Sequence, residues 1–299
     1  MASTFTTVHP SSEFMGRHSG PCRRYASVLA LVFVAAGTWV VNTQAAAPGP
    51  GKAAAVGLSS VDPATGQAPA CSKGSVYLTL DTGNMSQAEF MAQVLSRHDI
   101  KATFFVADER TPQGDSSLAP SWAGFWKARV AEGHAFGSHT LVHVYFREAL
   151  PDGRVRVRPE FGAQAGRTLT WDRTAVCHEI DRADQRFQRL TGQPLDRLWR
   201  APGGRAPATV MAAAKACGWA HVHWADAGFL GDELPSDRYP NERLLQQALK
   251  GIRGGDILMA HLGIWSRRDP WAPMLEPLIV GLKARGLCFA TLREHPAYR

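Results

Sequence analysis

The stretch Ala102-Thr103-Phe104-Phe105-Val106 is a short, almost continuous run of apolar and β-forming residues. A strand that is buried on both faces of a parallel sheet has this composition, whereas a half-exposed strand alternates apolar and polar side chains. A second strand with β-forming residues, Val76-Tyr77-Leu78-Thr79-Leu80, precedes it, and the intervening segment is long enough for a helical crossover. This pair predicts a parallel sheet built from strand–helix units.

The alternation of strands and helices continues to the end of the chain. Further strands are predicted at 134–138, 197–199, 221–224, 256–260 and 287–291. Helices are predicted from a capping box at Ser86 and Glu89, and at 120–131, 173–190, 207–218, 242–252 and 274–284. Residues 144–172 are polar and arginine-bearing, and we expect a long surface loop there. About seven strand–helix units predict an α/β fold, a distorted parallel (β/α) barrel.

The chain of 299 residues is 45% hydrophobic, which is enough for one large barrel domain. We expect that domain at residues 71–299. Residues 1–47 are predicted to be an export signal or membrane anchor, because arginines precede an apolar run that small residues follow. Residues 48–70, which are rich in Ala, Gly and Pro, are predicted to be a flexible linker. The domain is therefore expected in the periplasm or outside the cell, and at a membrane only through an uncleaved leader.

Removal of the leader would leave Cys71, Cys177, Cys217 and Cys288. An even number of cysteines in an oxidising compartment permits disulfides, with three possible pairings. We favour a bond between Cys71 and Cys288, because these residues flank the first and last strands of the domain. The alternative is four buried thiols.

The formal charge of the whole chain is +7. A modest positive charge suits anionic envelope polymers or lipid head groups, and no nucleic-acid-binding motif accompanies it. We therefore expect no nucleic-acid partner. The sequence does not indicate whether the protein is a monomer or an oligomer.

Two histidines stand four residues apart in Gly137-Ser138-His139-Thr140-Leu141-Val142-His143, directly after a predicted strand. On a helical turn, residues i and i+4 lie on the same side, so both imidazoles could bind one ion. Imidazole suits zinc and its neighbours, and a catalytic site needs one or two further ligands and an open position for water. The alternative is a buried histidine pair that binds no metal.

Five residues with chemically capable side chains follow predicted strands. In a parallel barrel the active site lies at the carboxyl ends of the strands, so these residues are expected at one rim. They are Asp81, His139, Arg200, Asp226 and His261. This convergence favours a metal site over a purely structural histidine pair.

Four motifs then resemble, in order and spacing, those of the polysaccharide deacetylase family, carbohydrate esterase family four. They are Thr79–Gly83 (TLDTG), His139–His143 (HTLVH), Arg200–Gly204 (RAPGG) and Leu258–His261 (LMAH). The resemblance covers about residues 74–292. It implies a distorted barrel and metal-dependent removal of N-acetyl or O-acetyl groups from a glycan that contains N-acetylhexosamine. The implied metal is zinc, with cobalt, nickel or manganese as alternatives.

The resemblance also implies a role for each matching residue. Asp81 would be the base that takes a proton from water, and Arg200 would hold and tune it. His139 and His143 would bind the metal, and His261 would protonate the leaving amine.

This sequence departs from the family pattern at Thr82, where the family has a metal-binding aspartate. A neutral hydroxyl is a poor ligand, so three outcomes are open: Asp81 moves onto the metal, Asn84 or water completes the shell, or the site is inactive. We favour a working site with both histidines, Thr82 at the metal position and Asp81 near the water.

A second departure concerns the family's adjacent aspartate and tryptophan in the substrate groove, which here are separated in His223-Trp224-Ala225-Asp226. We assign Trp224 as a sugar platform, with core packing as its alternative, and Asp226 as the residue that tunes His261. Pro202 is assigned to the substrate groove with them.

The sequence thus predicts an exported metal-dependent deacetylase that acts on an N-acetylated glycan. Two alternatives remain. One is a carbohydrate-binding relative that has lost hydrolysis through Thr82. The other is an amidohydrolase for a small molecule, which a narrow, closed pocket would favour.

Overall fold

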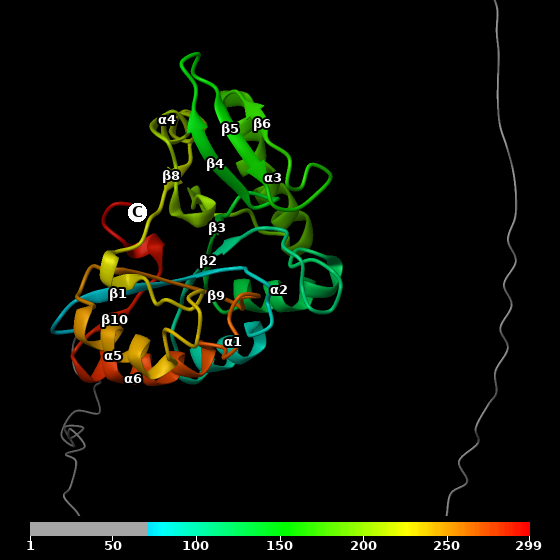
Figure 1. The fold of residues 1–299 in the computed structure, drawn as a ribbon. Coiled ribbons are helices and arrows are strands. Elements are labelled where there is room, and N and C mark those ends of the chain that lie inside the picture. Colours follow the sequence, from blue (N-terminus) through cyan, green and yellow to red (C-terminus); the bar gives the residue numbers. More distant parts are fainter. Residues whose placement is uncertain (1–70) are drawn as a thin grey trace, which may run out of the picture. The chain divides into compact units, whose positions relative to one another are not determined.

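The computed structural model describes residues 71–299, so the predicted leader (1–47) and linker (48–70) lie outside the described residues. Within this range, seven parallel strands curl into a half-barrel (Figure 1). Their order is β10, β1, β2, β3, β7 and β8, with β9 also paired with β1. The strands are β1 (Ser75–Asp81), β2 (Thr103–Val106), β3 (Ala135–Ser138), β7 (Leu198–Trp199), β8 (Ala220–His221), β9 (Ile257–His261) and β10 (Cys288–Phe289). The predicted distorted parallel barrel is confirmed.

The central strand β2 is buried along its whole length, as its apolar composition predicts. It pairs with β1 on one side and β3 on the other, with Phe104 opposite Leu80 and Phe136. The neighbouring Gly137 has no space for a side chain, because an added Cβ would lie 2.5 Å from the Phe105 ring. His139, the residue directly after β3, therefore lies at the carboxyl end of the strands, beside the end of β2.

Within residues 71–299, six α-helices pack around the sheet, and three of them, α1, α5 and α6, lie together on one side of it (Figure 1). The helices are α1 (Ala88–Arg97), α2 (Ala123–Ala131), α3 (Arg173–Thr191), α4 (Ala208–Ala216), α5 (Asn241–Gly251) and α6 (Leu275–Ala284). None of the helices within residues 71–299 has the length and apolar character needed to cross a bilayer.

The predicted capping box of α1 is wrong. The N-cap is Gln87, and no side chain caps the helix. Ser86 is instead part of a turn in which its backbone N–H donates to Asn84 Oδ1 at 3.0 Å. This turn competes with the capping geometry and moves the start of the helix toward the C-terminus.

The prediction of a surface loop at 144–172 is also wrong. The segment forms a three-stranded antiparallel sheet of β4 (Val144–Ala149), β5 (Val155–Pro159) and β6 (Leu169–Trp171). This sheet projects from the half-barrel in Figure 1. In β5, Val155 and Val157 are buried while Arg156 and Arg158 are exposed. This period of two is a strand signal that the arginine content concealed.

Two disulfides cross-link the described residues. Cys71 is bonded to Cys288, which confirms the favoured pairing. Cys177 of α3 is bonded to Cys217, the residue that ends α4. The first bond joins the segment before β1 to the start of β10, and the second joins two neighbouring helices.

Candidate active site

A cavity of about 360 Å³ lies at the carboxyl ends of the strands. Its wall combines strand-end residues with residues of the connecting segments. The lining includes Asp81, Asn84, Glu109, His139, His143, Tyr145, Glu160, Phe161, Trp224, Glu233, His261 and Trp265. Three of the five residues expected at one rim, Asp81, His139 and His261, therefore line one cavity.

Asp81, the last residue of β1, forms a buried ion pair with Arg200. Arg200 Nη1 donates to Asp81 Oδ1 at 2.8 Å, and the side chains are 0% and 3% exposed. Arg200 also lies over the Phe105 ring, with Cζ 4.2 Å from its centroid. Although burial opposes ionisation, the charges of Arg200 and His261 hold the pKa of Asp81 below its usual value. Asp81 is therefore an ionised carboxylate on the cavity wall.

His139 has its protonated nitrogen fixed by the backbone. Its Nδ1 lies 3.0 Å from the carbonyl oxygen of Arg200, which can only accept a hydrogen bond. Nδ1 therefore carries the proton, and Nε2, which lies 3.5 Å from Asp81 Oδ2, has the lone pair. Burial lowers the pKa of His139 to about 3, so the ring is neutral at neutral pH. A neutral ring with an oriented Nε2 is suited to metal binding.

His143 reaches the same place through a tight turn and not through the predicted helical turn. Thr140 and His143 both have positive φ values, 59° and 50°. The two imidazole centroids are nevertheless only 4.9 Å apart. Glu179 of α3 holds the turn, since its Oε1 accepts from Val142 N at 2.8 Å. The spacing of the two histidines therefore predicted their convergence but not the backbone that produces it.

Glu160, directly after β5, lies against His143. Its Oε2 is 2.6 Å from His143 Nδ1, which again leaves Nε2 for another partner. Burial opposes protonation of His143, but the carboxylates of Glu109 and Glu160 raise its pKa above the usual value.

Thr82 is fully buried and does not line the cavity. Its hydroxyl donates to Glu109 Oε1 at 2.5 Å and accepts from the backbone N–H of Ala107 at 3.2 Å. Gly83 N donates to the same Glu109 oxygen at 2.9 Å. The Thr82 hydroxyl is thus engaged by Glu109 and the backbone of Ala107, and burial raises the pKa of the Glu109 carboxyl.

His261, the last residue of β9, pairs with Asp232 on the segment after β8. Its Nδ1 lies 3.2 Å from Asp232 Oδ2, and its backbone N–H donates to the same oxygen at 2.7 Å. Burial disfavours the imidazolium, but Asp232 outweighs it and raises the pKa of His261 to about 10. His261 is therefore protonated at neutral pH. Asp226, the residue predicted to tune His261, is exposed and does not line the cavity.

Of the residues predicted to lie in the substrate groove, only Trp224 lines the cavity. Trp224 lines the cavity, with its ring centroid 5.4 Å from Arg200 Cζ and a stacked His223 behind it. Pro202 is buried and is not part of the lining, which its neighbour Gly203 supplies instead. Trp265, which the sequence did not single out, is 63% exposed and also lines the cavity.

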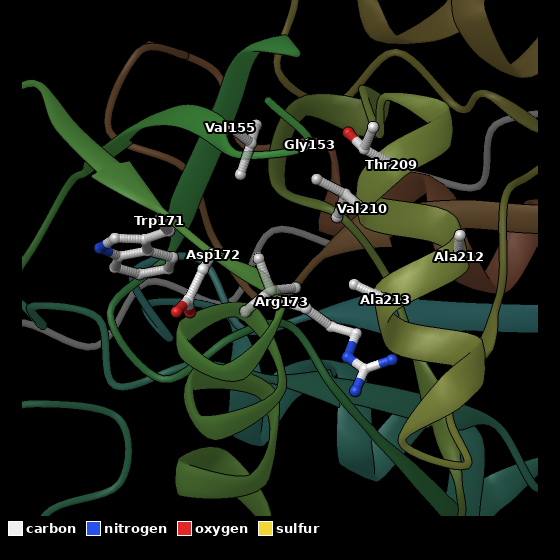
Figure 2. A pocket seen from close by; sticks show the side chains of 10 residues that line it. Gly153, Val155, Trp171, Asp172, Arg173, Thr209, Val210, Ala212 and Ala213 are labelled. Carbon is white, nitrogen blue, oxygen red and sulfur yellow. The ribbon is translucent and has the colours of Figure 1, made fainter. Parts of the chain in front are cut away.

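A second cavity of about 280 Å³ lies between the three-stranded sheet, the start of α3 and α4 (Figure 2). Its lining is largely apolar, with Val155, Val176 and Val210. Asp172 is the N-cap of α3, where its side chain accepts from Ala175 N. The lining of this cavity has no histidine, whereas the cavity at the strand ends has three.

The donor set of the first cavity fits a divalent ion. Two histidines present Nε2 atoms, because their Nδ1 atoms face a carbonyl and a carboxylate. Buried carboxylates on the same wall add the hard, negatively charged oxygen that such an ion requires. Among residues 71–299, no three His, Cys, Asp or Glu side chains are already gathered into a ligand cluster. The site therefore fits a divalent ion in the types of donor atom it offers and in the tautomer of His139.

Comparison with known proteins identifies the class. Residues 69–222, more than half of the chain, match the polysaccharide deacetylase family, and the chain belongs to this family. It is 28% identical over 223 residues to a chitooligosaccharide deacetylase of Bradyrhizobium sp. (strain ANU 289), with 71% of this chain and 86% of the relative covered. It is 23% identical over 228 residues to a peptidoglycan-N-acetylglucosamine deacetylase of Bacillus cereus, with 75% and 89% covered.

Solved structures share the fold at lower identity. A peptidoglycan N-acetylglucosamine deacetylase has a TM-score of 0.57 at 19% identity, with 76% of this chain and 90% of that chain covered. A family 4 acetyl xylan esterase from Clostridium thermocellum, in complex with cobalt, has a TM-score of 0.56 at 22% identity. The match covers 73% of this chain and 88% of that chain. A CE4 family pseudoenzyme from Bacillus anthracis has a TM-score of 0.54 at 19% identity. The match covers 77% of this chain and 70% of that chain. These likenesses show the fold alone.

Proposed function

We propose that this protein is an exported, metal-dependent hydrolase that removes N-acetyl groups from a glycan containing N-acetylhexosamine. The observation that carries the proposal is the arrangement around one cavity. An ionised Asp81 and a protonated His261 both line it, together with His139 and His143, whose Nδ1 atoms lie beside a carbonyl oxygen and a carboxylate oxygen. Amide hydrolysis needs this combination of a base, an acid and a group that polarises the carbonyl.

The residues that would hold the ion are His139 and His143, with a carboxylate as the third ligand. A bound divalent ion would supply Lewis-acid polarisation of the acetyl carbonyl and a lowered pKa for water. Asp81 would accept the proton of the attacking water, since Arg200 keeps it ionised at neutral pH. Asp81 is held by Arg200 at 2.8 Å, which fixes its orientation toward the cavity.

His261 would complete the reaction by donating a proton to the leaving amine. Asp232 supports this role in two ways, since it keeps the imidazolium charged and also binds the backbone of His261. Trp224 and the exposed Trp265 offer aromatic faces at which a sugar ring could stack. The relatives named as chitooligosaccharide and peptidoglycan-N-acetylglucosamine deacetylases support an N-acetylated glycan as the substrate.

The test is acetate release from acetylated chitooligosaccharides and from peptidoglycan, with and without added zinc or cobalt. We expect metal-stimulated release that His139→Ala lowers by at least about 10³-fold, because the variant loses a metal ligand and with it the polarisation of the carbonyl. His178→Ala, an exposed histidine on α3, is the matched control and should keep full activity. Persistent glycan binding without acetate release, with any metal, would instead favour a carbohydrate-binding protein.

A further inference from the structure

Glu109 is a buried carboxylate on the cavity wall, and none of the roles assigned above uses it. We propose that Glu109 supplies the third protein ligand of the metal, in place of the carboxylate that Thr82 lacks. This inference rests on the proposed function, because it names a further ligand of the same site.

Glu109 is held firmly, but through only one of its oxygens. Thr82 Oγ1 and Gly83 N both donate to Oε1, at 2.5 and 2.9 Å. Among the described residues, no protein donor forms a hydrogen bond with Oε2. The backbone of Glu109 is fixed as well, since its N–H donates to Ser117 Oγ at 2.9 Å. Thr82 therefore orients the carboxylate of Glu109, whereas an aspartate at this position would itself supply a carboxylate.

The other carboxylates in or beside the cavity have another partner, another proposed role or an exposed position. Asp81 is neutralised by the buried Arg200. Glu160 faces Nδ1 of His143, the nitrogen opposite the one left for an ion. Asp232 is bound to His261, and Glu233 is exposed. Glu109 is the remaining buried carboxylate of the lining.

The chemistry of the resulting set is suitable. Two histidines and one glutamate form a known type of catalytic zinc site, with a fourth position open for water. A carboxylate buried without a full counter-charge is also costly, and a divalent ion would offset that cost. Glu109, in the loop after β2, would then supply the carboxylate ligand that the family pattern places directly after β1, at position 82.

The experiment measures zinc affinity of the full chain by competition with a chelating dye, together with the visible absorption of the cobalt-loaded protein. Glu109→Gln keeps the size of the side chain and an acceptor for Thr82 and Gly83, but removes the charge. We expect zinc binding to weaken by more than about 100-fold, beyond the 10–100-fold typical of outer partners of a ligand. The cobalt spectrum should change in shape. Glu148→Gln, an exposed residue of β4, is the matched control and should bind like the wild type.

The double variant Thr82→Asp with Glu109→Gln tests the exchange of ligands directly. If Glu109 is the ligand, moving the carboxylate to position 82 should recover at least about tenfold of the lost affinity relative to Glu109→Gln alone. The zinc-induced rise in melting temperature should follow the same order, which provides a readout even if a variant is less stable.

The outcomes separate this inference from the proposed function. Unchanged zinc affinity and cobalt spectrum in Glu109→Gln, with binding lost in His139→Ala, would overturn the role of Glu109 and leave the metal-dependent hydrolase intact. Absence of zinc binding by the wild type itself would overturn both.

Discussion

The candidate site has two halves that reach the cavity by different routes. The strand-end half consists of residues at or directly after the ends of parallel strands, namely Asp81, His139, Arg200 and His261. The loop half comes from connecting segments and consists of Glu109, Glu160 and Trp265, which line the cavity, and of Asp232, which lies against His261. Under the proposed function, the strand-end half carries the proton-transferring groups, while the loop half sets the charge of His261, contacts His143 and contributes the proposed metal ligand Glu109. The following predictions rank the two halves by their effect on activity.

The largest effect is expected for Asp81→Asn in the strand-end half. The amide cannot accept the proton of water, so kcat should fall by about 10³-fold. The asparagine oxygen can still accept from Arg200, and circular dichroism should show a folded protein. Asp226→Asn is the control, because Asp226 is exposed and lies outside the cavity lining, and its activity should match the wild type. Comparable losses in both variants would contradict the division of the site.

An intermediate effect is expected for Asp232→Asn in the loop half. Without this carboxylate, burial lowers the pKa of His261, and the acid form is depleted at neutral pH. We expect kcat at pH 7 to fall by about 10²-fold. The alkaline limb of the pH–rate profile, near pH 10 in the wild type, should move to lower pH. Asp237→Asn, on the same segment and exposed, should leave the profile unchanged.

The same pair also predicts how stability depends on pH. The pKa of His261 is raised from an ordinary value of 6.5 to about 10 in the folded state. Its stabilisation is therefore complete below pH 6.5 and is lost as the pH rises toward 10. Melting temperatures measured between pH 6.5 and 10 should decline less in Asp232→Asn than in the wild type. An identical decline in both proteins would show that the pair does not stabilise the fold.

The smallest effect is expected for Trp265→Ala, because this tryptophan can contact the substrate only at the mouth of the cavity. Loss of aromatic stacking should raise KM by about 3–10-fold while kcat stays nearly constant. Phe90→Ala, a partly exposed aromatic residue of α1 outside the cavity, is the control. A fall in kcat larger than the rise in KM would place Trp265 with the reacting groups.

The two halves also differ in how well the sequence predicts them. The register of parallel strands fixes which residues meet at the carboxyl end, so Asp81, His139 and His261 could be placed together from strand positions alone. Asp232 could not be separated from Asp226 in this way. Both follow β8, and the choice depends on the path of the segment between β8 and α5, for which the sequence has no periodic signal.

The interpretation of residues 144–172 shows a different limit. Arginine content suggested a solvated loop, but Val155 and Val157 bury one face of β5. The alternation was present in the sequence and could have been recognised. The pairing of Thr82 with Glu109 could not, since it joins two loops 27 residues apart through a side chain that has no motif.

The disulfide between Cys71 and Cys288 closes a covalent ring around almost the entire barrel, since the two cysteines are separated by 217 positions along the chain. In the loop-entropy picture such a ring stabilises the fold by about 5 kcal/mol. The ring is fastened at the base of β1 and β10, whereas the cavity lies at the far end of β1, about 20 Å away for a strand of this length. A pulling force applied to the chain on the N-terminal side of Cys71 would therefore act first on the disulfide and on the adjoining starts of β1 and β10. The residues around His139 would keep their geometry under that load.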